Sequence, residues 1–156
     1  PAAVVLGLRS GRYPAASPLP GLPPGQGRLE GGRLTVELPE DLNWIDRTWS
    51  PVSQSFTRSV TGKAIIQVSA AQLGQPITLQ APDRGGWMLA TKEPQILAWH
   101  NEPGQKLTLD FHGETHTVQF RHHDGLGYES TPLRFQINPG PDHRVIPTFR
   151  FITVEP

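Results

Sequence analysis

The chain has 156 residues, a length typical of one domain that can bury a core of its own. Its 14 basic and 14 acidic residues leave no net charge, so the basic excess of a nucleic-acid-binding protein is missing and no nucleic-acid partner is expected. The chain contains no cysteine, which excludes disulfides and cysteine-based zinc sites.

Proline and glycine are frequent, whereas long apolar segments are missing. Seventeen Pro and sixteen Gly predict a chain rich in loops and β-structure and poor in helix. No apolar run approaches the roughly 18 residues that a membrane-spanning helix needs. The apolar segment AAVVLGL is short and has no basic segment before it, so we expect neither a signal peptide nor a membrane span.

Residues 1–32 differ from the rest of the chain in composition. They hold six Pro and seven Gly, and AVVLGLR near their start is a candidate short strand. Such an arm makes few contacts of its own, so we expect a partner surface to order it. Arg9, Arg12 and Arg28 are candidates for pairing with acidic groups on that partner. The sequence therefore predicts an extended arm over 1–32 and a folded domain over 33–156.

From Arg33 onward, apolar and polar residues alternate with the period of a β-strand. RLTVEL places its Leu and Val residues on one face, and Pro39 ends the run. SQSFTRSVTG and KAIIQVSA are two further β-rich segments with a break at Thr61 and Gly62, and PITLQA follows them. YESTPLRFQI and IPTFRFITVE supply two closing strands joined by the loop NPGPD.

One short helix is expected over residues 92–101. Thr91 is the expected N-cap, and Glu93 and Pro94 lie in the first turn, where both residue types are favoured. The spacing predicts a short apolar stripe made of Ile96, Leu97, Trp99 and His100.

The clearest hairpin is KLTLDFHGETHTVQF. A two-residue loop of His112 and Gly113 pairs Phe111 with Glu114. With that register one face carries Leu107, Leu109, Phe111, His116, Val118 and Phe120. In total we expect about nine or ten short strands, and the fold class is mainly β: a compact β-barrel or β-sandwich with one short helix and an extended N-terminal arm.

The histidines are the first candidates for chemistry. HGETH places His112 and His116 four residues apart, but on an extended strand this spacing spans about 13 Å, too far for one metal ion. His122 and His123 point to opposite faces if the strand continues. We therefore expect no metal site and no cofactor. A metal-assisted hydrolase that uses these four histidines remains the enzymatic alternative.

Other possible catalytic patterns have simpler explanations. Glu40 and Asp41 follow a proline after a strand, which is typical of a solvated turn. The glycine-rich GRLEGG neither follows a strand nor ends in the Lys-Ser/Thr of a P-loop, and no Gly-x-Ser-x-Gly occurs. We predict no catalytic residue and no enzymatic activity.

The four tryptophans are candidates for core packing, for an interface or for a sugar-binding platform. Trp44 and Trp49 lie in NWIDRTWSP, where their odd spacing puts them on opposite faces of a strand. One is expected in the core and the other at a contact with a partner. Trp44 and Trp49 therefore join Arg9, Arg12 and Arg28 as candidate interface residues.

Several short motifs between Leu34 and Asp124 resemble those of small tail-tip or baseplate proteins, the minor tail proteins of long-tailed bacteriophages. The motifs are W-S-P-V-x-Q-S, S-V-T-G, G-x-P-I-T-L, the G-W turn before the helix, and T-h-x-F-R-H, in which h is apolar. They are structural motifs, and the resemblance implies no catalytic residue.

The resemblance implies a structural role in a phage tail. We expect a homo-oligomeric ring, assembled in the host cytoplasm, that links the tail tube to the host-binding apparatus of the virion, with other tail or baseplate proteins as partners. The alternative is a β-module that binds a carbohydrate or another cell-surface ligand through exposed aromatic side chains.

Overall fold

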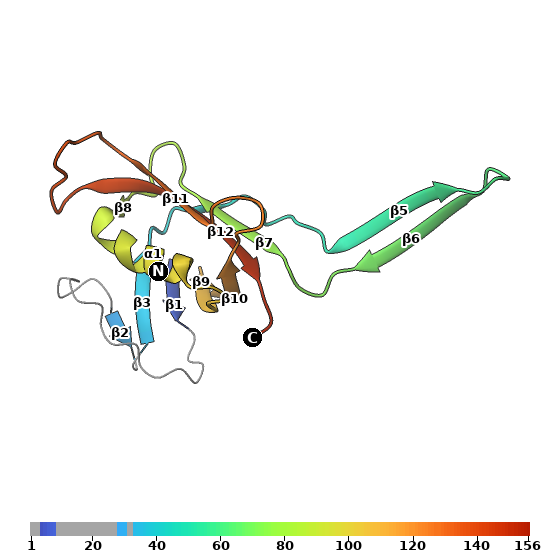
Figure 1. Ribbon diagram of the computed structural model, residues 1–156, viewed down its shortest axis with the longest axis horizontal. Helices are drawn as coiled ribbons and strands as arrows, with labels where there is room; N and C mark the ends of the chain where they lie inside the picture. Colours follow the sequence, from blue (N-terminus) through green and yellow to red (C-terminus); the bar gives the residue numbers. More distant parts are fainter. Residues whose placement is uncertain (1–3, 9–27, 31–32) are drawn as a thin grey trace.

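The computed structural model describes residues 4–8, 28–30 and 33–156 (Figure 1). These residues form twelve strands, one 3-10 turn and one α-helix. In chain order they are β1 (Val4–Leu8), β2 (Arg28–Glu30), β3 (Arg33–Leu38), β4 (Asn43–Trp44), β5 (Val52–Arg58), β6 (Ala64–Ala70), β7 (Pro76–Gln80), β8 (Met88–Leu89), η1 (Ala90–Lys92), α1 (Glu93–Asn101), β9 (Leu107–Phe111), β10 (Glu114–Phe120), β11 (Tyr128–Pro132) and β12 (Arg144–Thr153).

Ten of these strands form one antiparallel sheet, which with α1 makes up the body of the molecule. The strand order is β2-β3-β1-β9-β10-β12-β7-β4, and β8 and β11 also pair with β12. The prediction of a mainly β fold with one short helix is confirmed. A closed barrel is not confirmed, because the end strands β2 and β4 of the described sheet do not pair with each other.

Strand β1 lies inside the sheet, between β3 and β9. Val4 is opposite both Leu38 and Phe111, and Val4 and Leu6 are buried. The predicted boundary at residue 32 is therefore wrong for Val4–Leu8, because these residues belong to the core of the domain. Strand β2 likewise pairs with β3. The remainder of the predicted arm lies outside the described residues.

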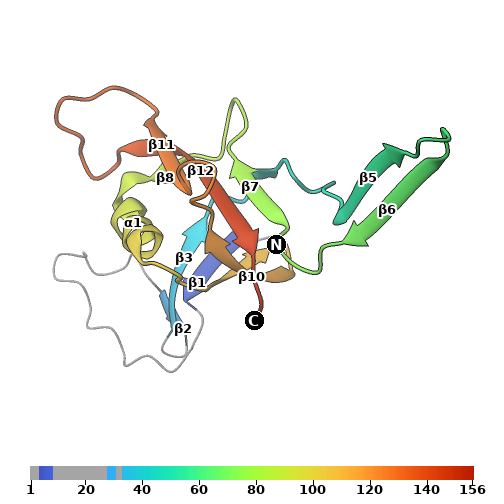
Figure 2. The ribbon, with the colours of Figure 1, turned by 45° about the vertical axis from the view of Figure 1, so that its right-hand side comes forward.

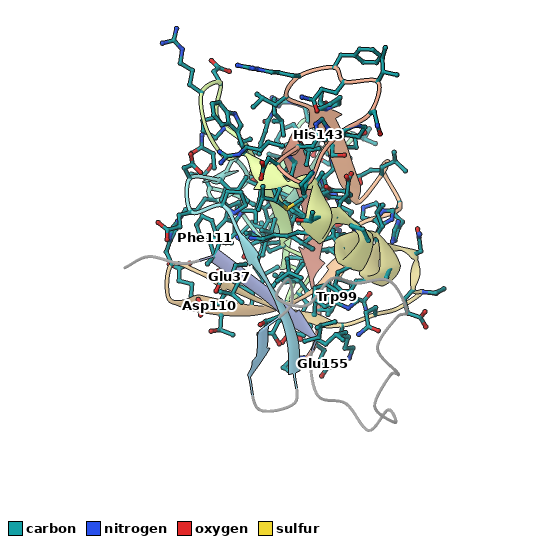
Figure 3. All side chains as sticks on the ribbon, turned by 90° about the vertical axis from the view of Figure 1, so that its left-hand side faces the viewer. Glu37, Trp99, Asp110, Phe111, His143 and Glu155 are labelled. Atoms are coloured by element: carbon teal, nitrogen blue, oxygen red, sulfur yellow. The ribbon has the colours of Figure 1, made fainter. Side chains whose placement is uncertain are left out.

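The core is centred on β12, which alternates buried and half-buried residues along its length. The rings of Phe149 and Phe151 are fully buried and stack at 5.9 Å between centroids. On one side α1 contributes Ile96 and Trp99, both buried. Figure 3 shows this packed body with Trp99 labelled on the helix and Phe111 at the end of β9. Burial of these apolar side chains is the main force that holds the sheet and the helix together.

The helix begins one residue later than predicted, and its N-cap differs. Residues Ala90–Lys92 form a 3-10 turn that leads directly into α1, so the N-cap is Lys92 and has no side-chain cap hydrogen bond. The prediction of Thr91 as the cap is wrong, since Thr91 lies within that turn. Of the predicted stripe, Ile96 and Trp99 are buried, whereas Leu97 is exposed.

The hairpin of β9 and β10 is confirmed residue by residue. Phe111 pairs with Glu114, Leu109 with His116 and Leu107 with Val118. The loop residues His112 and Gly113 have φ of 50° and 91°, the left-handed values that a two-residue turn of this type requires.

Strands β5 and β6 form a separate two-stranded sheet. This hairpin projects away from the body along the longest axis of the molecule, and it stands clear of the body in two views (Figures 1 and 2). The loop between β11 and β12 lies at the opposite end (Figure 1). Within the described part of the chain, no helix has the length and apolar character needed to cross a membrane.

Candidate interaction surface

Every residue of β5 and β6 is exposed, and the two faces of this hairpin differ in chemistry. Opposite partners in an antiparallel pair share a face. One face, called the apolar face below, carries four large apolar side chains that are each more than half exposed: Val52, Phe56, Ile66 and Val68. The other face carries Ser53, Ser55, Thr57, Ile65, Gln67 and Ser69. The hairpin is thus amphipathic although neither face touches the body.

The tip of the hairpin is a compact hydrogen-bonded turn. The N–H of Gly62 donates to the carbonyl of Ser59 at 2.8 Å, and the N–H of Lys63 donates to the Ser59 hydroxyl at 3.1 Å. Gly62 has φ of 83°, a left-handed conformation that explains the predicted break at Thr61 and Gly62. Val60 is fully exposed at the end of the turn. The tip therefore presents an apolar side chain to solvent on a well-defined turn.

The first leg of the hairpin, residues 45–51 between β4 and β5, is tied to the body. The N–H of Ile45 donates to the carbonyl of Thr78 at 3.1 Å, and the Thr78 hydroxyl donates to the Asp46 carboxylate. Arg47 pairs with Glu114 at 2.7 Å across the surface of the body. That ion pair is half-exposed, so it contributes at most about 1 kcal/mol.

The second leg, residues 71–75 between β6 and β7, returns to the body beside the C-terminal end of β12. The N–H of Gly74 donates to the carbonyl of Thr153 at 3.2 Å, and Gln75 and Thr153 exchange hydrogen bonds. Both legs are therefore held by neighbouring strands of the main sheet, which fixes the base from which the hairpin projects.

The two tryptophans predicted at an interface lie near the first leg. The prediction that they share one strand is wrong, because β4 ends at Trp44 and a turn separates it from Trp49. Trp44 is half-buried and packs edge-on against Phe111 and His116, with ring centroids 5.8 and 5.5 Å away. The Arg47 guanidinium lies over the Trp44 ring at 5.4 Å. Trp49 is exposed, and its backbone N–H donates to the carbonyl of Asp46 at the base of the hairpin.

The predicted interface arginines lie outside the described part of the structure. Arg9 and Arg12 are not among the described residues, and for Arg28 only its place in β2 is described. Their proposed pairing with acidic groups of a partner stays a prediction.

An open groove on the body carries another exposed aromatic side chain, that of Trp87. Trp87, Lys92 and Arg144 line this groove together with Glu37 of β3. Lys92 donates from Nζ to the carbonyl oxygen of Glu37 at 2.8 Å. Trp87 is 42% exposed, so its ring is accessible beside two positive side chains.

The histidines predicted as metal candidates are dispersed. His112 is exposed in the turn between β9 and β10, whereas His116 is half-buried against Trp44. His122 lies 4.6 Å from His100, ring centroid to ring centroid, at the exposed rim of the body. Among the residues that the structure describes, no three His, Asp or Glu side chains are grouped so as to hold a metal ion.

Two acidic residues singled out by sequence, Asp41 and Glu93, have structural partners. Asp41 accepts a hydrogen bond from the N–H of Gly86 at 2.7 Å, which ties the loop after β3 to the turn before β8. Near α1, the Ser130 hydroxyl donates to the Glu93 carboxylate. Burial, and then the negative charge of Glu93, raise the pKa of the nearby Tyr128 phenol far above its ordinary value.

Comparisons of the chain with protein-family models, with curated proteins and with solved structures find no match. The function must therefore be argued from the residues themselves. Sequence reasoning located β5 and β6 as strands but missed their projection from the body. The sequence did contain one signal for an exposed hairpin: two β-rich segments with little charge lie on either side of a tight turn.

Proposed function

We propose that this protein is a structural subunit of a bacteriophage tail tip or baseplate, in which several copies form a ring that links the tail tube to the host-binding apparatus. The observation that carries the proposal is the projecting hairpin with its uncovered apolar face. A monomeric protein gains nothing from holding four large apolar side chains in water, and exposed patches of this kind mark interaction sites.

The positions of the tail-protein-like motifs support the same proposal. W-S-P-V-x-Q-S spans the first leg and the start of β5, S-V-T-G is the tip, and G-x-P-I-T-L covers the second leg and the start of β7. Three of the five motifs therefore surround the hairpin. The resemblance to minor tail proteins is concentrated on the element that is best suited to contact a partner.

The location in the virion is tested on whole particles. An antibody raised against the purified protein is expected to label one end of the tails in a lysate of the bacterium that carries the coding sequence. Disrupting the coding sequence is expected to stop the production of complete tails. Particles that assemble and infect normally without the protein would contradict the proposal.

A second candidate function rests on the groove beside Trp87. An exposed indole next to Lys92 and Arg144 is suited to stack on a sugar ring that carries a negative charge. In that case the purified protein should bind acidic glycans on an array, and Trp87→Ala should abolish the signal. Leu97→Ala, at an exposed apolar residue of α1 that does not line this groove, is the matched control. An array without signal argues against this function.

A further inference from the structure

The backbone hydrogen bonds of the β5–β6 hairpin determine which groups remain unpaired at its two edges. At one end the N–H of Ser59 donates to the carbonyl of Lys63 at 2.9 Å, and at the other the N–H of Ala71 donates to the carbonyl of Pro51 at 2.8 Å. Bonded and non-bonded pairs alternate along an antiparallel ladder. Odd-numbered residues therefore bond across the hairpin, and even-numbered residues direct their N–H and C=O outward.

Both outward edges are regular and accessible. The outward residues are Val52, Gln54, Phe56 and Arg58 on β5, and Ala64, Ile66, Val68 and Ala70 on β6. The seven residues of each strand pair without a bulge, and neither strand contains proline. Each edge is thus a continuous row of hydrogen-bonding groups open to another strand.

The edges lack the features with which soluble proteins block unwanted strand pairing. Such features are lysines, prolines, bulges and inward-pointing charges. Arg58 carries the single charge of the two strands. It lies at the end of β5, and its guanidinium lies over the Phe56 ring at 5.4 Å, so no charged residue stands in the middle of either edge. The lack of such blocking features, together with the exposed apolar face, indicates that the two edges can pair with another strand.

A two-stranded sheet is also too small to be stable by itself. An isolated hairpin is at best marginally stable in water, and three or more strands with an apolar face are needed for independent stability. Within the described residues, β5 and β6 pair only with each other. An additional strand at either edge would therefore stabilise the hairpin, and none of the described residues supplies one.

We propose that the hairpins of neighbouring copies pair edge to edge, with β6 of one copy antiparallel to β5 of the next. The two edges have the same length and run in opposite directions, so a rotation that repeats from copy to copy brings each β6 beside the next β5. The same junction then recurs at every interface, and closing the ring leaves no free edge. The pairing rests on the proposed ring of copies and identifies its interface.

Pairing in this way also brings apolar side chains of neighbouring copies into lateral contact. In the direct register, Ile66 of one copy lies opposite Phe56 of the next copy, on the same face of the joined sheet. Apolar cross-strand neighbours of this kind stabilise a sheet, and the alternating pattern keeps the serines together on the opposite face. The joined hairpins therefore form one amphipathic sheet.

Cysteine cross-linking tests the pairing, because the chain contains no cysteine of its own. Odd-numbered residues of adjacent copies become the close, non-bonded pairs, with Cα atoms about 4.5 Å apart, within the range for a disulfide. Ser55→Cys is mixed separately with Ile65→Cys, Gln67→Cys and Ser69→Cys. These three mixtures cover the direct register and a shift of two residues in either direction.

One mixture is expected to give a disulfide-linked dimer under mild oxidation, well above the yield from any variant alone. Ser55→Cys mixed with Thr115→Cys, an exposed residue of β10, is the matched control. If all three mixtures give no more dimer than this control, edge pairing is wrong. That result would leave the tail function standing, since antibody labelling of tails tests it separately.

A proline on the edge provides a second test. The N–H of Gln54 points outward, so Gln54→Pro keeps the hydrogen bonds within the hairpin but blocks the β5 edge. The wild-type protein is expected to scatter light as a multiple of 17.2 kDa, with association weakened roughly tenfold or more by Gln54→Pro. Gln54→Ala keeps the N–H and should associate normally. A wild-type monomer, or equal association of both variants, would overturn the inference.

Discussion

At the scale of single residues, the turns of the body depend on glycines whose backbone no other residue adopts easily. Gly86 has φ of 67° and donates its N–H to Asp41 in the turn before β8. A Cβ added at Gly86 would lie 2.8 Å from the Cβ of Ala81. Gly104, after α1, has nearly the same φ of 71°, but nothing lies within 4 Å of an added Cβ. An alanine at Gly104 would therefore meet only backbone strain, whereas an alanine at Gly86 would meet the same strain and steric crowding as well.

Gly86→Ala is therefore expected to lower the free energy of unfolding more than Gly104→Ala. The left-handed backbone alone costs about 1–2 kcal/mol at each site. Crowding against Ala81 adds to this cost at Gly86. Urea unfolding of both variants measures the difference. Equal losses would show that the turn relaxes around the added methyl group.

A second prediction at this scale concerns the pH dependence of stability. Burial raises the pKa of the Tyr128 phenol above its ordinary value of 10.0, and Glu93 adds to the effect. The stabilising contribution of the neutral phenol is complete below pH 10. It is lost as the pH rises further, because the unfolded chain releases its proton first. Above about pH 10 the free energy of unfolding should fall more steeply in the wild type than in Tyr128→Phe, by up to about 1.4 kcal/mol per pH unit. Parallel pH profiles would contradict this.

At the scale of secondary-structure elements, β12 and the β5–β6 hairpin contain similar types of residue but have opposite environments. β12 carries aromatic and branched residues that are buried against β7, β10 and α1. β5 and β6 carry residues of the same kind that are exposed. The alternation of apolar and polar residues is similar in both, so what differs is whether another layer covers the apolar face.

This difference predicts very different costs for the same substitution. Phe149→Ala in β12 should lower the free energy of unfolding by about 3–5 kcal/mol, because it leaves a cavity in a fully buried site. Phe56→Ala in β5 should lower it by less than about 0.5 kcal/mol. Both are measured at low protein concentration, where association contributes least. A large loss for Phe56→Ala would mean that the hairpin packs on the body.

At the scale of the whole molecule, the structure consists of a packed body and a projecting hairpin. The core lies within the main sheet and α1, and the hairpin is attached through its two legs. The exposed apolar residues of the hairpin and of the loop between β11 and β12, which include Phe135 and Ile137, lie at opposite ends of the long axis (Figure 1). The residues of the folded core and the large exposed apolar residues of the hairpin thus lie in different parts of the chain.

Removing the hairpin tests this separation. Pro51 and Ala71 are hydrogen-bonded partners across the base, so an Asn-Gly turn can replace residues 52–70 without stretching either leg. We expect a cooperative thermal transition with Tm within about 2 °C of the wild type, together with loss of association. Loss of the cooperative transition would show that the body needs the hairpin to fold.

Much of the local structure was determined by the sequence alone. The hairpin at His112 and Gly113 was predictable down to its register, because a two-residue turn and the alternation of its strands agree. The Thr61–Gly62 break and the mainly β class followed from the same local rules. The helix cap at Thr91 was predicted incorrectly, because the preceding 3-10 turn competes with the cap and includes Thr91.

Only the tertiary structure decided which strands pair and which faces are covered. VVLGL is recognisable as a strand, but its place between β3 and β9 depends on partners about 30 and 100 residues away in the chain. The alternation in β5 and β6 likewise defines an apolar face, but it cannot say whether the body covers that face. Periodicity is a local property of the chain, whereas burial depends on contacts between distant segments. Among the described residues, those contacts leave both strands of the hairpin exposed.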